Sequence, residues 1–403
     1  MPALKHVLAA IALLLGAALS QTSPASAQEQ IMQIQVTPAD RAAVALHRRV
    51  HTKGALRPEG GHYPPKTFET DSSGALLEVT GVSRSSIQSM PVAASQAVTV
   101  TPPFTGPGFF PADLSLVSNS GETITQAQVH NIYINCTASC WGYPAVFEHN
   151  LFSSRFIHVL DQYVGSEEDG RYTVGPSLVI SNYQYTLQNV TNPMVNYADL
   201  DAILHAAASR FGSGYSHIYN IFLPKGVDYC NGYAPPYTFC FSPDNPSTWA
   251  ECAEHDTDSF SDIPGVEYAT VEPYPDVFEI VPVNGVPTPV YPCDVGQPPP
   301  FTSDTNPTPN GVLIDAVSDD VGHEIFETIT DPDGIEWLAQ QGYFGFLSAP
   351  PPIGTGAAPA IEIADVCELN NGTAIFTPFY ISGHLYEVQP MYSNKYHACV
   401  TVP

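Results

Sequence analysis

An imidazole and two carboxylates lie at helical spacing late in the chain, where His323, Glu324 and Glu327 form the pattern H-E-x-x-E. Residues four positions apart lie on one face of a helix, so His323 and Glu327 could bind the same metal ion. In the better-known H-E-x-x-H helix, two histidines bind zinc and the glutamate is the general base. The pattern therefore predicts the helix of a zinc hydrolase, with Glu324 as general base. A solvated helix face with ordinary polar residues would show the same pattern.

A third metal ligand must come from another segment of the chain. The candidates are four acidic residues and one histidine: Asp331, Asp333, Glu362, Asp365 and His255. Asp333 lies ten residues beyond His323, where H-E-x-x-H-x-x-G-x-x-H enzymes place their third ligand, although D-P-D-G is also an ordinary turn sequence. His255 would give two histidines and one carboxylate. The likeness to H-E-x-x-H predicts Zn²⁺. A carboxylate-rich ligand set makes bound water less acidic than three histidines do, so another divalent metal is the alternative.

Apolar and capping residues around the motif predict the limits of this helix. The side opposite the proposed ligands is apolar, with Val321, Ile325 and Ile329. Ser318 is a suitable N-cap, and the residue before Pro332 avoids the helical backbone conformation. We therefore expect a short helix from residue 319 to about residue 330.

Residues 1–27 have the pattern of a secretory signal peptide. Lys5 precedes a long apolar run, and the sequence A-S-A before Gln28 provides a small-residue cleavage site. We expect a secreted, extracellular protein, with the periplasm as the alternative, whose mature chain begins near Gln28. Later apolar runs are too short for a membrane span, so none is expected in the mature chain.

The chain has eight cysteines, which in an exported protein are more often disulfide-bonded than metal-bound. We expect two local bridges and two longer ones: Cys136–Cys140, Cys230–Cys240, Cys252–Cys293 and Cys367–Cys399. The last bridge would tie the C-terminal strand to the segment that holds Asp365.

The formal net charge is −27 at pH 7 and is unevenly distributed. Residues 28–90 hold seven basic and six acidic residues, whereas residues 91–403 hold five basic and 34 acidic ones. So acidic a domain repels nucleic acid and anionic membranes and leaves carboxylates available for divalent cations. We expect no nucleic-acid partner, and instead a protein or peptide substrate or a cell-wall polysaccharide. A surface suited to acidic or extracellular conditions would also explain the charge.

Two parts with different patterns follow the signal peptide. Residues 28–105 are rich in Ser, Pro, Gly and Thr, with a helical pattern only at 38–50, and we expect a linker or prosegment with little structure. Residues 106–403 predict one α+β domain with a mixed, largely antiparallel sheet packed on helices. The expected strands are 129–134, 177–180, 217–223, 267–271 and 277–281, the expected helices 154–163 and 198–211, and the expected hairpin 374–381 with 385–392.

Six blocks of the chain carry the sequence patterns of one known family. They are residues 129–133, 221–227, 252–255, 323–332, 362–367 and 388–399. Together they resemble the bacterial branch of the phosphate-induced protein (Exordium-like) family, over roughly residues 106–403. The resemblance implies a secreted, single zincin-like domain of the kind often described in bacteria as a candidate metallopeptidase. Ala253 and Glu254 depart from the family's C-G-x-H pattern, and plant members of the family lack the H-E-x-x-E.

Two functions are compatible with these patterns. The first is a secreted zinc-dependent hydrolase, in particular a metallopeptidase, whose ion is bound by His323, Glu327 and one of Asp365, His255 and Asp331. Glu324 would take a proton from the attacking water, and His384 or His397 could stabilise the oxyanion. The second is a non-catalytic extracellular or cell-wall-associated binding protein of the same fold, because 21 Tyr and 19 Phe would suit carbohydrate stacking.

Overall fold

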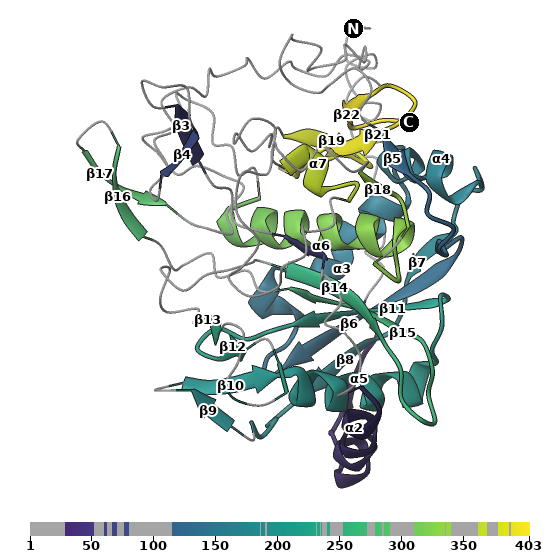
Figure 1. Cartoon of the computed structure of the whole chain (residues 1–403), viewed down its shortest axis with the longest axis vertical. Helices are drawn as coiled ribbons and strands as arrows, with labels where there is room; N and C mark the ends of the chain where they lie inside the picture. Colours follow the sequence, from purple (N-terminus) through teal and green to yellow (C-terminus); the bar gives the residue numbers. More distant parts are fainter. Residues whose placement is uncertain are drawn as a thin grey trace, which may run out of the picture. The chain divides into compact units, whose positions relative to one another are not determined.

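A mostly parallel β-sheet lies at the centre of the computed structural model (Figure 1). The structure describes residues 29–51, 60–62, 67–70, 76–79, 115–185, 187–189, 192–230, 232–233, 235, 240–241, 253–271, 279–283, 286–290, 310–334, 336–339, 362–368, 378–386 and 388–403. Residues 31–403 form one compact unit.

Eight strands of the described chain form this central sheet. Their order is β1 (Ile31–Ile34), β8 (Ser177–Ile180), β6 (Ala127–Ile134), β11 (His217–Phe222), β15 (Val266–Val271), β14 (Ala253–Asp258) and β2 (Gly60–His62), with β7 (Tyr172–Val174) also paired to β6. The pairs from β1 to β15 and the β6–β7 pair are parallel. β14 runs antiparallel to both β15 and β2, so the antiparallel pairs lie at one edge of the sheet.

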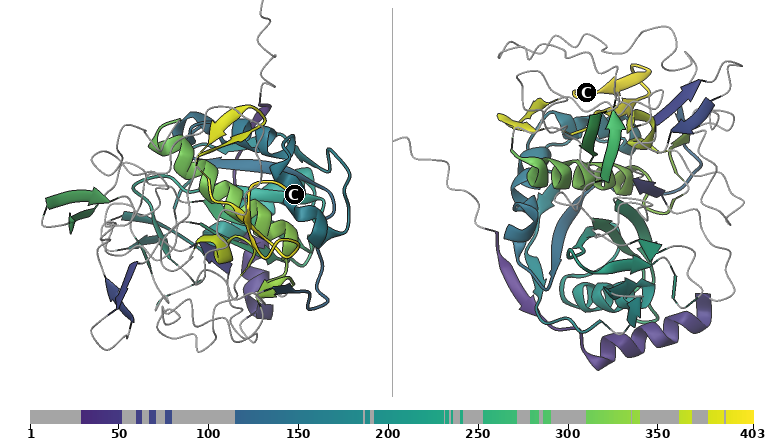
Figure 2. Two further views of the ribbon diagram at one scale, coloured as in Figure 1. Left: turned by 90° about the horizontal axis from the view of Figure 1, so that it is seen from above. Right: turned by 90° about the vertical axis from the view of Figure 1, so that its left-hand side faces the viewer.

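One face of the sheet is covered by α2 (Pro38–His51) and α5 (Tyr197–Phe211) (Figure 2). Ile203 of α5 shares a buried apolar cluster with Ile132 and Ile221 of the sheet. Asn196 is the N-cap of α5. Its side chain accepts hydrogen bonds from the backbone N–H groups of residues 198 and 199.

The other face of the sheet is covered by a second group of helices. These are α3 (Pro144–Phe152), α4 (Asp161–Val164), the short 3-10 helices η1 (Ala138–Trp141) and η2 (Phe156–Leu160), and α6 (Val312–Thr330). Ile325 of α6 shares a buried cluster with Val129 and Phe222. Neighbouring residues of one strand point to opposite faces, so β6 supplies Val129 to this cluster and Ile132 to the other. The result is a three-layer arrangement of helices, sheet and helices.

Smaller elements complete the described chain. They are β9 (Leu187–Asn189), β10 (Asn192–Asn196), β12 (Asp228–Cys230) and β13 (Cys240–Phe241) in a second sheet, the pairs β3 (Thr67–Thr70) with β4 (Leu76–Val79), β5 (Leu116–Val117) with β18 (Leu338–Ala339), β16 (Glu279–Val283) with β17 (Val286–Val290), β19 (Phe379–Ile381) with β20 (His384–Tyr386) and β21 (Met391–Ser393) with β22 (Ala398–Val400), and the one-turn helix α7 (Asp365–Glu368). Among the described helices, none combines the length and the apolarity that a membrane crossing requires.

The sheet is mixed, as predicted, but the expectation that it is largely antiparallel is wrong. β6, β8 and β11 are parallel because the chain returns to the same end of the sheet through α3, α4 and α5 and the loops beside them. β15 is parallel to β11 because the antiparallel strand β14 precedes it. These four strands are also almost entirely buried, as strands covered on both faces are.

The expectation of little structure between residues 28 and 105 is wrong for the first part of that segment. β1 extends the central sheet by pairing with β8, in the register Ile31 to Ser177, and α2 packs against α5. Val44 of α2 is buried in the same cluster as Ile203. The structured domain therefore includes residues 31–51, and the predicted boundary at residue 106 is too late.

Several other boundaries differ from their predictions. α6 begins at Val312 rather than at residue 319, and Ser318 is not its N-cap, because the Ser318 hydroxyl donates to the carbonyl of Ile314 within the helix. Residues 156–164 form a 3-10 turn followed by one α-turn instead of a single helix. The strand predicted at 385–392 is divided between β20 and β21, since each pairs with a different partner.

Three predicted disulfides are confirmed: Cys136–Cys140, Cys230–Cys240 and Cys367–Cys399. The predicted Cys252–Cys293 bridge lies outside the described residues. The Cys367–Cys399 bridge joins α7 to β22, across Cα atoms 5.7 Å apart.

Candidate metal centre

α6 carries His323, Glu324 and Glu327 into the interior of the protein. Each of the three is 0 % exposed, so the interpretation of the motif as a solvated helix face is wrong. α6 packs against the sheet strands β14 and β15 on one side and against α3 on another. Its polar and apolar residues are both buried because neighbouring segments of the chain surround it.

β14 supplies the second imidazole of the centre. His255 Nδ1 lies 3.1 Å from Glu324 Oε2 and 3.7 Å from Glu327 Oε2. The preceding residue, Glu254, points to the opposite face of the sheet, where it accepts a hydrogen bond from the hydroxyl of Tyr229. The alternation of side chains along β14 therefore directs His255 toward α6.

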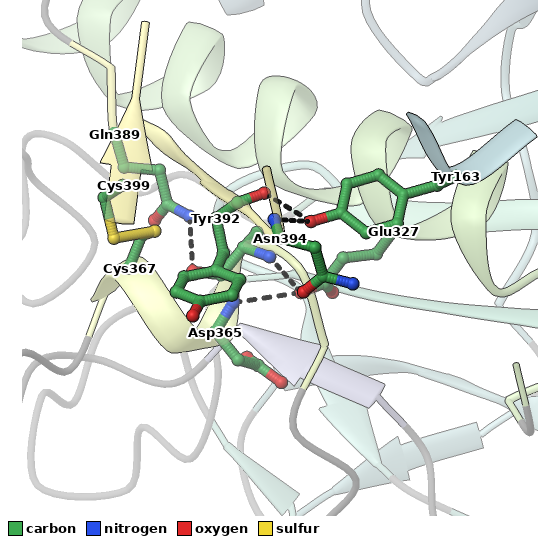
Figure 3. Close-up of a disulfide and its surroundings, with 9 residues drawn as sticks. Tyr163, Glu327, Asp365, Cys367, Gln389, Tyr392, Asn394 and Cys399 are labelled. Atoms are coloured by element: carbon green, nitrogen blue, oxygen red, sulfur yellow. Dashed lines mark hydrogen bonds between the residues drawn. A yellow bond between two sulfur atoms is a disulfide. The ribbon is translucent and has the colours of Figure 1, made fainter. Parts of the chain in front are cut away.

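The segment from Glu362 to α7 supplies two further carboxylates. Glu327 Oε1 accepts hydrogen bonds from the backbone N–H groups of Ala364 (3.2 Å) and Asp365 (3.1 Å), which hold this segment against α6 (Figure 3). Asp365 Oδ2 accepts from the backbone N–H of Glu362 at 3.1 Å, so one carboxylate fixes the backbone of the other. The Cys367–Cys399 disulfide anchors the end of the segment (Figure 3).

A chain of hydrogen bonds through Gln389 joins this segment to α6. Gln389 Nε2 donates to the carbonyl of Ala364 at 3.0 Å, and the backbone N–H of Gln389 donates to Asp319 Oδ1 of α6 at 2.7 Å. Nearby, the hydroxyl of Tyr163 donates to the carbonyl of Tyr392 (Figure 3). Asp319 and Gln389 position this segment, a role that the H-E-x-x-E pattern does not predict. The only sequence signal for Gln389 was its place in the block 388–399.

These side chains form two groups with the composition of a metal site. One group is His323, Glu327 and Asp365, the other is His255, Glu327 and Glu362, and the ligand atoms within each group lie within 4.8 Å of one another. All five residues are buried, Asp365 being the most exposed at 6 %. Both groups could therefore hold a metal ion out of contact with bulk solvent.

Two of the distances within the groups are longer than a typical direct hydrogen bond and suit two ligands of one ion. His323 Nε2 lies 3.1 Å from Glu327 Oε2 and 3.7 Å from Asp365 Oδ1, and His255 Nε2 lies 3.5 Å from Glu362 Oε2. A tetrahedral ion with ligand bonds of about 2.1 Å would hold its ligand atoms about 3.4 Å apart. Among the described residues, Oε1 of Glu324 has no hydrogen-bond partner, and the buried carboxyl group of Glu362 lies against the carboxyl groups of Asp331 and Glu327. Buried carboxylate oxygens of this kind are suited to a cation.

Mutual interactions determine the protonation of the centre. Burial disfavours the charged form of both imidazoles. Contacts with Glu327 nevertheless raise the pKa of His323 well above its ordinary value. The hydrogen bond to Glu324, together with the neighbouring negative charges, raises the pKa of His255 to about 9. Burial by itself would raise the pKa of Glu327, but the charges of His323 and His255 outweigh it and lower that pKa. Glu327 is thus the anion that the two imidazolium groups stabilise.

The remaining carboxyl groups favour their protonated forms. Burial raises the pKa of Glu324, Glu362 and Asp365, and the charge of Glu327 raises each of these pKa values further. A divalent ion binds neutral imidazole and ionised carboxylate, so it would displace protons from these residues on binding.

The other candidate residues lie outside the two groups. Asp331 is buried at the end of α6, where its Oδ1 accepts from the backbone N–H of Glu336 at 2.6 Å, and its carbonyl lies 3.4 Å from His255 Nε2. Asp333 accepts a hydrogen bond from the hydroxyl of Tyr215 at 2.8 Å. His384, at the start of β20, and His397, in the turn between β21 and β22, are exposed and belong to neither ligand group.

Searches of protein families, of curated proteins and of solved structures found no match to this chain.

Proposed function

We propose that the protein is a secreted, zinc-dependent hydrolase that acts on proteins or peptides. The observation that carries the proposal is the convergence of His323 and Glu327 of α6 with His255 of β14 and the carboxylates of Glu362 and Asp365. These five side chains come from three segments far apart in sequence and are all buried. A purely structural packing of so many ionisable groups would be costly without a cation.

The residues of the chain divide into binding and proton-transfer roles. An ion would be held by His323, Glu327 and Asp365, or by His255, Glu327 and Glu362. A divalent ion held there would lower the pKa of a water molecule and polarise a substrate carbonyl. Glu324 lies beside both imidazole groups, and its free Oε1 is suited to accept the proton of the attacking water and to return it to the leaving amine.

The location and substrate class rest on further observations. Three disulfides are consistent with an oxidising, extracellular environment, in agreement with the signal-like residues 1–27. The resemblance to bacterial Exordium-like proteins supports a zincin-like domain with peptidase chemistry.

A second candidate function is a non-catalytic extracellular protein, such as a cell-wall-associated binding protein, in which the ion only stabilises the fold. The burial of every ligand side chain favours this alternative, because structural metal sites are closed whereas catalytic sites keep an open position.

Elemental mass spectrometry on the purified mature protein is the first test. We expect zinc at one equivalent or more in the wild type and its loss in His323→Ala. His149→Ala, which changes an exposed histidine of α3, is the matched control and should retain the metal. Absence of metal from the wild type, after purification without chelators and incubation with Zn²⁺, would contradict the proposal. Bound metal without hydrolysis of unfolded protein substrates would favour the second candidate.

A further inference from the structure

The two ligand groups share one residue. Glu327 belongs to both, whereas His323 and Asp365 belong only to one and His255 and Glu362 only to the other. Each group therefore has one imidazole and one carboxylate of its own. A single ion in one group would leave the imidazole and the carboxylate that belong only to the other group without a metal ion.

Glu327 has the geometry of a bridging carboxylate. Its Oε1 is held by the backbone N–H groups of Ala364 and Asp365, which fixes the orientation of the side chain. Its Oε2 lies 3.1 Å from His323 Nε2 and 3.7 Å from His255 Nδ1, and the ligand atoms within each group lie within 4.8 Å of one another. A single oxygen in this position can contact two ions on opposite sides, as in two-metal sites whose ions are about 3.5–4 Å apart.

Glu362 provides an independent indication of a second ion. It is 0 % exposed, and its carboxyl group lies against the carboxyl groups of Asp331 and Glu327. His255 Nε2 lies 3.5 Å from Glu362 Oε2. An ion bound only by His323, Glu327 and Asp365 would leave this buried cluster of carboxyl groups without a cation of its own.

We propose that this centre binds two divalent metal ions, one on His323 and Asp365 and the other on His255 and Glu362, with Glu327 shared between them. The proposal rests on the metal centre of the proposed function and adds its stoichiometry. A two-ion centre would orient a carbonyl or phosphoryl substrate between two positive charges, which one zinc ion in a zincin-like helix does not do.

Metal titration of the metal-free, full-length mature protein tests the stoichiometry. The protein is titrated with Zn²⁺ by calorimetry, and its bound zinc is then counted by elemental mass spectrometry after desalting. We expect two equivalents for the wild type, one for Glu362→Gln, one for Asp365→Asn and fewer than one for Glu327→Gln. Glu168→Gln, which changes an exposed glutamate, is the matched control and should retain two. Circular dichroism of each variant checks that it is folded.

Electron paramagnetic resonance with Mn²⁺ tests whether the two ions are neighbours. We expect the exchange-coupled spectrum of a Mn²⁺ pair in the wild type and the spectrum of isolated Mn²⁺ in Glu362→Gln. One equivalent of zinc in the wild type, or two equivalents without coupling, would overturn the two-ion proposal and leave the proposed function standing. No bound metal at all would overturn both.

Discussion

At the scale of single residues, the centre depends on Glu327. Its two oxygens have different roles: Oε1 fixes the backbone of the segment before α7, and Oε2 faces both imidazoles. Glu324, three residues earlier on α6, contacts His255 and keeps one oxygen without a hydrogen bond among the described residues. The H-E-x-x-E motif therefore contains one residue suited to binding and organising the site and one suited to proton transfer.

Glu324→Gln separates these two roles. The substitution keeps the shape of the side chain but removes the base, so we expect peptide hydrolysis to fall by about 100- to 10,000-fold while the metal content stays unchanged. Turnover of an unfolded protein substrate and elemental mass spectrometry on the same sample measure the two quantities, with Glu168→Gln as control. Unchanged turnover in Glu324→Gln would exclude it as the general base.

At the scale of elements, the centre is made where a helix, the strand β14 and a short segment meet. α6 can approach α3 closely at Gly322, where an added Cβ would lie 3.3 Å from the ring of Phe147. β14 is fixed by its pairing with β15, in the register His255 to Ala269. The segment from Glu362 to the end of α7 contains only the one helical turn of α7. Hydrogen bonds and the Cys367–Cys399 disulfide must therefore hold it in place.

Removing the Cys367–Cys399 bridge tests this dependence. We expect Cys367→Ser with Cys399→Ser to lower the free energy of unfolding by about 3–4 kcal/mol, because the bridge closes a long loop, and to weaken Zn²⁺ binding by about tenfold or more, because the ligand segment loses its anchor. Urea denaturation and calorimetric titration measure the two effects. Cys136→Ser with Cys140→Ser is the control, since that bridge holds no ligand segment. Equal loss of zinc affinity in both variants would contradict this role of the bridge.

At the scale of the whole molecule, ionisable groups are buried on both sides of the sheet. On the face opposite α6, the ring of His130 is stacked on Phe211 at a centroid distance of 4.4 Å. Its Nδ1 lies 2.9 Å from the carbonyl of Pro176 and its Nε2 lies 3.1 Å from His217 Nδ1. A neutral ring satisfies both contacts by donating from Nδ1 and accepting at Nε2. Burial lowers the pKa of His130 to about 4.

This shift predicts a loss of stability in mild acid. The unfolded chain takes up a proton at His130 near pH 6.5, whereas the folded protein does so only near pH 4. The free energy of unfolding therefore decreases as the pH falls from 6.5 to 4, by up to about 3 kcal/mol. His130→Gln cannot take up this proton, and we expect its free energy of unfolding to change less steeply between pH 7 and pH 4. Urea denaturation at several pH values measures the slope. The slope of His149→Gln should match the wild type, and an equally steep slope in His130→Gln would refute the prediction.

Local chemistry of the sequence determined a large part of this protein. His323, Glu324 and Glu327 share one helix because their spacing follows the helical period, and that helix ends before Pro332 because proline disfavours helical backbone in the residue preceding it. The bridges Cys136–Cys140 and Cys230–Cys240 join cysteines that are close in sequence. The strand at 177–180 was predicted with its observed limits, since it is a short apolar run.

Only the tertiary structure decided which residues meet the helix. His255 and Glu324 are 69 positions apart, and no local pattern fixes the path of the chain between them. The direction of each strand likewise depends on the connections between strands, because a buried apolar run suits a parallel or an antiparallel neighbour equally well. Burial was also a tertiary outcome: the pattern on α6 allowed a solvated face, and the packing of β14, α3 and the segment before α7 around it turned that face into an enclosed centre of charged groups.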